Sequence, residues 1–237
     1  MPPRTDRASD ALRPVTLELD VAPYAEGSCL VSFGSTRILC AASIEEGVPS
    51  WRRGSGEGWL TAEYAMLPRS TRTRTARERT QLGGRTQEIQ RLIGRSVRAM
   101  LNDFRFGELT VRIDCDVLQA DGGTRTAAIT GAAVAVRQAF SGLVTAGKIE
   151  TTPIVRNVAA VSVGVVDGEP RVDLNYEEDV AAAVDMNVVL STEGKFVEVQ
   201  GTGESGTFSR GELDRLVDMA VTAIGSLHAL QDRALGA

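Results

Sequence analysis

The sequence has 237 residues, of which 43% are hydrophobic and 24% are charged, a composition that fits a globular protein with a sizeable core. No apolar run is long enough to span a bilayer, and residues 1–13 lack the apolar core of a signal peptide. Three cysteines without metal-ligand spacing indicate reduced thiols, so we expect a cytoplasmic protein with no membrane partner. A single histidine argues against histidine metal sites and histidine-based triads.

The hydrophobic pattern predicts strands followed by a helix in both halves of the chain. The first half has expected strands at residues 15–19, 28–33, 37–44, 59–67 and 109–116, and helices at 86–104 and 127–140. The second half has expected strands at residues 158–166, 171–175, 184–190 and 196–200, and a closing helix at 210–230. We therefore predict an α+β fold, a duplicated β-hairpin and helix unit with mixed sheets packed with helices, rather than a doubly wound parallel sheet. Residues 1–237 would form one domain with two pseudo-repeated halves, roughly 12–143 and 156–233.

A glycine turn follows the strand that begins at residue 109. Gly122 and Gly123 break the strand, and Thr124 is a fair N-cap for the helix after it. The backbone N–H groups at such a helix start favour an anion, and Arg125 adds a planar cation that suits phosphate. The motif is neither a Walker loop nor Gly-x-Gly-x-x-Gly, so an ordinary strand-to-helix turn with a surface arginine stays open.

Arginines are concentrated between residues 69 and 98, a segment with nine arginines and only two glutamates. The whole protein, by contrast, has a net charge of −5. Residues 69–79 have few apolar side chains, so we expect a mobile loop that binds a polyanion such as RNA. The alternative is a solvated loop with no partner. The candidate RNA-binding residues are Arg69, Arg72, Arg74, Arg77 and Arg79.

Acidic residues are grouped early in the second half, at Asp173, Glu177, Glu178, Asp179 and Asp185. Asp185 interrupts an otherwise apolar strand and shares one face of it with Asn187. Grouped carboxylates can hold a hard cation such as Mg²⁺ or act as a general acid. For Glu177 and Glu178 a set of solvated turn acids is an equal alternative. An anion site, an acid cluster and an arginine tract together fit phosphoryl transfer on a nucleic acid.

Four ordered blocks of the sequence resemble the ribonuclease PH family, the bacterial phosphorolytic 3′-to-5′ exoribonucleases that trim tRNA precursors. The blocks are residues 56–64, 84–95, 114–126 and 198–202. The resemblance implies that Arg85, Gly123, Thr124 and Arg125 bind phosphate. It also implies a catalytic role for Asp179 and Asp185 with a divalent cation, Mg²⁺, and a homo-hexamer built as a trimer of dimers.

The resemblance gives a specific functional hypothesis. The protein would be a phosphate-dependent 3′-to-5′ exoribonuclease that trims tRNA precursors, releases nucleoside diphosphates and adds nucleotides in reverse. Two alternatives remain, a non-catalytic RNA-binding ring subunit of an RNA-degrading assembly and a hydrolytic two-metal nuclease. Arg4 and Arg7 stand where the family usually has a Gly-Arg pair, and Ala65 stands where glycine is common. We expect neither departure to touch the site.

Overall fold

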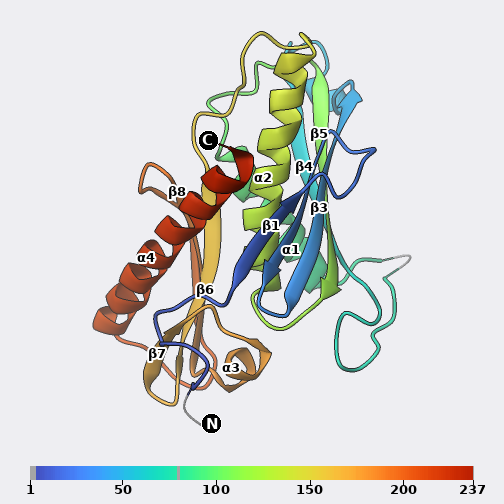
Figure 1. The fold of residues 1–237 in the computed structure, drawn as a ribbon. Helices are drawn as coiled ribbons and strands as arrows, with labels where there is room; N and C mark the ends of the chain where they lie inside the picture. Colours follow the sequence, from blue (N-terminus) through green and yellow to red (C-terminus); the bar gives the residue numbers. More distant parts are fainter. Residues whose placement is uncertain (1–3, 79–80, 237) are drawn as a thin grey trace.

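The computed structural model describes residues 4–78 and 81–236. It contains two sheets with helices between and beside them (Figure 1). The first sheet has the order β1-β2-β3-β5-β4, and the second has the order β7-β6-β8-β9. The first sheet is formed by β1 (Val15–Leu19), β2 (Gly27–Phe33), β3 (Thr36–Glu46), β4 (Trp59–Met66) and β5 (Leu109–Gln119). The second sheet is formed by β6 (Val158–Val166), β7 (Glu169–Val172), β8 (Val184–Ser191) and β9 (Phe196–Gly203).

The strand pairings confirm the predicted α+β class. Only β4 and β5 pair in parallel, whereas every other pairing of named strands is antiparallel. The helices are α1 (Gly84–Arg98), α2 (Thr124–Thr145), α3 (Tyr176–Ala181) and α4 (Arg210–Leu235), with one 3₁₀ turn at Ser50–Arg52. The described residues therefore form mixed and antiparallel sheets rather than a doubly wound parallel sheet. The grouping of both halves into one domain stays a prediction.

Helix α2 is the central helix of the core. It packs against β2 and β3 of the first sheet and against β6 of the second, so it lies between the two sheets (Figure 1). By length and composition alone, this 22-residue helix contains a window that is long and apolar enough to cross a membrane. That corrects the expectation that the chain has no such run. The window is 72% buried inside the protein, which is the environment of a core helix.

Two helix boundaries differ from the prediction for local physical reasons. The helix expected at residues 86–104 ends at Arg98. The prediction ran too long because the apolar periodicity continues into the turn residues Met100 and Leu101, which are also buried. The N-cap of α2 is Gly123 in a left-handed conformation, not Thr124, which is already helical. The N-terminus of α2 thus begins directly after the glycine turn.

Candidate active site

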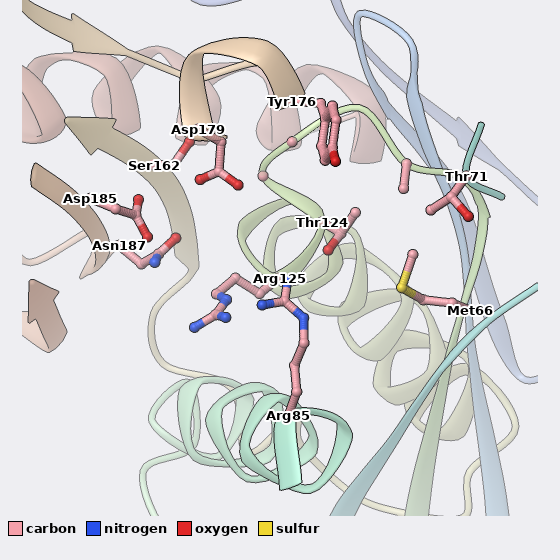
Figure 2. A pocket seen from close by; sticks show the side chains of 13 residues that line it. Met66, Thr71, Arg85, Thr124, Arg125, Ser162, Tyr176, Asp179, Asp185 and Asn187 are labelled. Carbon is pink, nitrogen blue, oxygen red and sulfur yellow. The ribbon is translucent and has the colours of Figure 1, made fainter. Parts of the chain in front are cut away.

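A cleft between the two halves contains the residues that the sequence singled out. Its inner part is a cavity of about 240 Å³, and an adjoining cavity of about 630 Å³ shares five of its side chains. The shared side chains are Arg85, Arg125, Asp179, Asp185 and Asn187. Figure 2 shows the two arginines in the lower part of the cavity, with Asp185 at the left, Asp179 and Tyr176 at the top, and Thr71 and Met66 at the right.

The glycine turn brings the first half against the second. Gly122 and Gly123 both have positive φ angles, 74° and 64°, which side-chain-bearing residues rarely adopt. A Cβ atom on Gly122 would lie 2.4 Å from the backbone oxygen of Leu174, so only glycine allows this approach. The hydroxyl of Thr36, the first residue of β3, donates a hydrogen bond to the Gly122 carbonyl and accepts one from the Asp121 N–H. These two bonds attach the glycine turn to the start of β3. The first half therefore contributes the glycine turn and the start of α2 to a cleft whose other wall belongs to the second half.

Two arginines reach the cleft from different helices. Arg125 lies in the first turn of α2, where the helix dipole is positive, and Arg85 lies in the first turn of α1. Arg125 Nη1 donates to Gln200 Oε1 at 3.0 Å and lies 3.3 Å from Glu88 Oε2, so its guanidinium is already oriented. Two guanidinium groups beside a helix N-terminus provide a site that suits a phosphate group.

The carboxylates face this positive wall from the second half. Asp179 lies on α3, and Asp185 lies on β8, where its strand neighbours are buried. Burial, followed by the negative charge of Asp179, raises the pKa of Asp185 to about 6. Burial also raises the pKa of Asp179, while Arg85 and Arg125 act in the opposite direction. The Oδ1 atom of Asp185 is buried and has no hydrogen-bond partner among the described residues, so it is free to bind a ligand in the cleft.

Helix α3 separates Glu177 from Glu178, for which solvated turn acids were an equal alternative. Glu178 is buried and closes a capping box with Asn175, which starts the helix. Burial acts to raise the pKa of Glu178, but hydrogen bonds from Arg4 and from the Asn175 backbone lower it to about 2. Glu177 remains exposed and pairs with Arg72 at 2.9 Å. Of the two acids, only Glu177 fits the solvated alternative.

Arg4 and Arg7 stay outside the cleft, as expected, but they contact the segment that carries Asp179. Arg4 donates two hydrogen bonds of 2.7 Å to the Glu178 carboxylate, and Arg7 donates to the Asp173 carbonyl at 2.7 Å. The first described residues accordingly lie beside α3 in Figure 1. These two arginines do not line the cleft, but they hold the helix that does.

The predicted arginine loop leaves the body of the protein as an irregular segment (Figure 1). Between Met66 and Gly84 the described residues form no helix or strand. Arg79 lies outside the described residues. The other candidates in the loop are exposed: Arg69, Arg72, Arg74 and Arg77. Because Arg72 pairs with Glu177 of α3, the start of the loop lies next to the cleft.

Sequence reasoning missed several residues of the site. Tyr64 donates a hydrogen bond of 2.8 Å to the hydroxyl of Thr124, and Gln200 binds Arg125. Both lie in sequence blocks that pointed to the family resemblance, but their contacts depend on chain segments far apart. Tyr176 lines the cavity beside the acids of α3. Its place immediately before the acid cluster was the one available signal.

Two protein-family models match the chain. The model described as "3' exoribonuclease family, domain 1" matches residues 11–140, and "3' exoribonuclease family, domain 2" matches residues 157–223. A protein of Saccharopolyspora erythraea named Ribonuclease PH is 56% identical over 98% of this chain and 93% of its own length. A protein of Mycobacterium avium with the same name is 57% identical over 97% of this chain and 90% of its own.

Solved structures with low sequence identity share the fold. Rice Rrp46 is 18% identical with a TM-score of 0.77, and the alignment covers 95% of this chain and 96% of that one. A chain of the Archaeoglobus fulgidus exosome with RNA bound to the active site is 20% identical with a TM-score of 0.80, covering 94% and 90%. The two family models and the near-full-length relatives show that this chain belongs to the 3′ exoribonuclease family.

Proposed function

We propose that the protein removes nucleotides from RNA 3′ ends by phosphorolysis and releases them as nucleoside diphosphates. One observation carries the proposal: Arg85, Arg125 and the N-terminus of α2 face Asp179 and Asp185 across a single cleft. A hydrolytic nuclease that relies on metal-bound water has no need of a phosphate site built from two arginines and a helix N-terminus. Phosphorolysis needs such a site for its co-substrate. Relatives named Ribonuclease PH are consistent with this reaction.

In the proposed reaction, Arg85 and Arg125 hold inorganic phosphate against the backbone N–H groups of Gly123 and Thr124. An oxygen of this phosphate attacks the phosphorus of the terminal phosphodiester. The bond from that phosphorus to the 3′ oxygen of the preceding nucleotide breaks, and the 3′ oxygen takes a proton. The two arginines stabilise the charge on both phosphoryl groups, so most of the catalysis is positioning and electrostatics. In reverse, the same site adds a nucleotide from a diphosphate.

Asp179 and Asp185 supply the acidic half of the site. Asp185 has a raised pKa and can protonate the departing 3′ oxygen. The alternative role for Asp185 is that of an ionised ligand: together with Asp179 it fits Mg²⁺, because Asp185 Oδ1 is buried without a protein partner and Mg²⁺ binds through one or two carboxylates together with substrate phosphates. Among the described residues no larger cluster of metal-ligating side chains exists. A bound Mg²⁺ would neutralise charge on the phosphoryl groups. Asp179 and Asp185 are the residues that would hold it.

The proposed substrates are tRNA precursors and other RNA 3′ ends. The loop at residues 69–78 starts beside the cleft, where Arg72 pairs with Glu177, and its exposed arginines suit a nucleic-acid backbone. We further propose a homo-hexamer, a trimer of dimers, which would bring several such loops around one RNA. Three buried and unpaired cysteines agree with a reducing, cytoplasmic location.

One assay separates the possible activities. Short single-stranded RNA is incubated with Mg²⁺, with and without inorganic phosphate, and the released mononucleotide is identified. Phosphorolysis predicts nucleoside diphosphate only when phosphate is present. Monophosphate formed equally in both buffers would indicate a hydrolytic nuclease, and RNA binding without any product would indicate a non-catalytic ring subunit. Light scattering of the same preparation tests the hexamer.

A further inference from the structure

The cleft has one side that the phosphate chemistry does not use. Arg85, Arg125 and the carboxylates account for its charged part, whereas Tyr176, Met66 and Ala120 form an apolar part. A nucleotide has the same division, with a charged phosphate and a flat apolar base. We propose that Tyr176 is the stacking platform for the base of the 3′-terminal RNA nucleotide. This inference rests on the proposed function, because it assumes an RNA 3′ end in the cleft.

The position of Tyr176 supports this assignment. Tyr176 is the first residue of α3, and Asp179 lies three residues later on the same face of the helix. Side chains with that spacing have Cβ atoms about 5–6 Å apart, so a phosphoryl group near Asp179 places its own nucleoside near the ring. Figure 2 shows the Tyr176 ring in the cavity, between Asp179 and Thr71. The ring and the carboxylate can therefore contact the same nucleotide.

The Tyr176 ring is accessible, and the Tyr176 backbone is held in place. Tyr176 is 50% exposed and lines the cavity, so a ligand in the cleft can reach its ring. Its backbone N–H donates to Asp121 Oδ1 at 3.3 Å, and the helix is held by the Asn175–Glu178 capping box and by Arg4. A ring presented on a fixed helix loses little entropy when a base stacks on it.

Stacking suits an enzyme that must remove successive nucleotides of any sequence. Every base has a π face, so an aromatic platform binds all four bases without reading their hydrogen-bonding edges. The amide and carboxylate groups that could read the edge of a base lie instead on the acidic side of the cleft, where Asn187 is next to Asp185. The apolar side thus supplies affinity, with a preference for the larger purine rings.

The test compares two short RNAs that differ only in the terminal base, adenine or cytosine. Tyr176→Phe keeps the ring, Tyr176→Leu removes it, and Tyr24→Leu is the matched control because Tyr24 is 99% exposed and does not line the cleft. Phosphorolysis of each RNA is measured at saturating phosphate. Equilibrium binding of each RNA is measured without phosphate. Circular dichroism and light scattering check the fold and the oligomer of each variant.

We expect Tyr176→Leu to weaken binding of the adenine-ended RNA about tenfold, equivalent to about 1.4 kcal/mol, and binding of the cytosine-ended RNA less. Tyr176→Phe and Tyr24→Leu should bind both RNAs like the wild type, and the KM for phosphate should not change. Unchanged RNA binding in folded Tyr176→Leu would overturn the inference, as would an equal loss for both RNAs together with a changed oligomer. If the wild type itself forms no diphosphate, the proposed function fails instead.

Discussion

Arg13 and Asp173 form a buried ion pair that joins the glycine turn to the half of the protein that carries the carboxylates. Arg13 Nη2 lies 2.7 Å from Asp173 Oδ1, and Arg13 Nε donates to Asp173 Oδ2 at 3.0 Å. The same guanidinium donates to the Asp121 carbonyl at the start of the turn. The two side chains are only 5% and 1% exposed, and Asp173 adopts a left-handed backbone with φ of 54°. This pair fixes the distance between the two walls of the cleft.

Breaking this pair should lower both stability and phosphate affinity. Arg13→Gln leaves the Asp173 carboxylate buried without its partner, which costs about 3–5 kcal/mol of unfolding free energy. Arg13→Lys keeps the charge but loses the planar fork, so it should fold and show a raised KM for phosphate with little change in RNA binding. Denaturant unfolding and phosphate titration measure the two effects.

The matched control for the pair is Arg137→Gln, which removes an ion pair with Asp232 whose side chains are 29% and 45% exposed. A pair at the surface contributes about 0–1 kcal/mol, so this variant should resemble the wild type. Equal stability losses at Arg13 and Arg137, with phosphate KM unchanged in Arg13→Lys, would show that Arg13 does not position the turn.

The arginines of the phosphate site should be sensitive to loss of their planar shape. Arg85→Lys and Arg125→Lys keep the positive charge but cannot form two parallel hydrogen bonds to one phosphate. Each variant should need much more phosphate for half-maximal rate, whereas RNA binding in phosphate-free buffer stays close to the wild type. Arg91→Lys, on the exposed face of α1, serves as the control. Unaltered phosphate dependence in both site variants would exclude this location for the anion.

Asp185 should matter for turnover more than for binding. Asp185→Asn keeps the shape of the side chain but removes its charge and its capacity to donate a proton. We expect folding and RNA affinity near those of the wild type and a loss of at least about 100-fold in kcat, because a general acid contributes on the order of 10²–10⁴. A single-turnover assay with saturating phosphate measures the loss. Near-normal turnover in this variant would remove Asp185 from the chemistry.

The arginine loop should bind the body of a structured RNA. Replacing Arg72, Arg74 and Arg77 with alanine should weaken binding of a tRNA precursor and lower its salt slope by about one for each RNA phosphate that the loop no longer neutralises. Phosphorolysis of a short single-stranded RNA should change little. Equal losses on both substrates would place the loop at the catalytic centre, and no loss on either would leave it a solvated loop.

Local sequence signals predicted most of the fold. Alternating apolar residues identified the strands, and Gly122–Gly123 identified the turn that opens the site, because positive φ angles at two successive positions strongly favour glycine. The six-residue helix α3 was missed, since a helix this short has little intrinsic stability. It is stabilised by Arg4, which is 174 residues away from Glu178 in the sequence, so no local pattern reports the contact.

The chemistry of the candidate site could be predicted better than its geometry. The residue types and spacing around Arg125 and Asp185 indicated an anion site and an acid, but they did not indicate that both face the same cleft. That arrangement depends on Gly122 packing against Leu174 and on Arg13 binding Asp173. Such contacts join residues of different halves, so no local periodicity or propensity reports them.

The most direct test of phosphorolysis follows the phosphate itself. The protein is incubated with Mg²⁺, unlabelled RNA and isotopically labelled inorganic phosphate, and the released nucleotides are separated. If phosphate is the attacking group held by Arg85 and Arg125, the label appears as the β-phosphate of nucleoside diphosphates, one label for each nucleotide removed. Release of unlabelled nucleoside monophosphates at the same rate with or without phosphate would contradict the account.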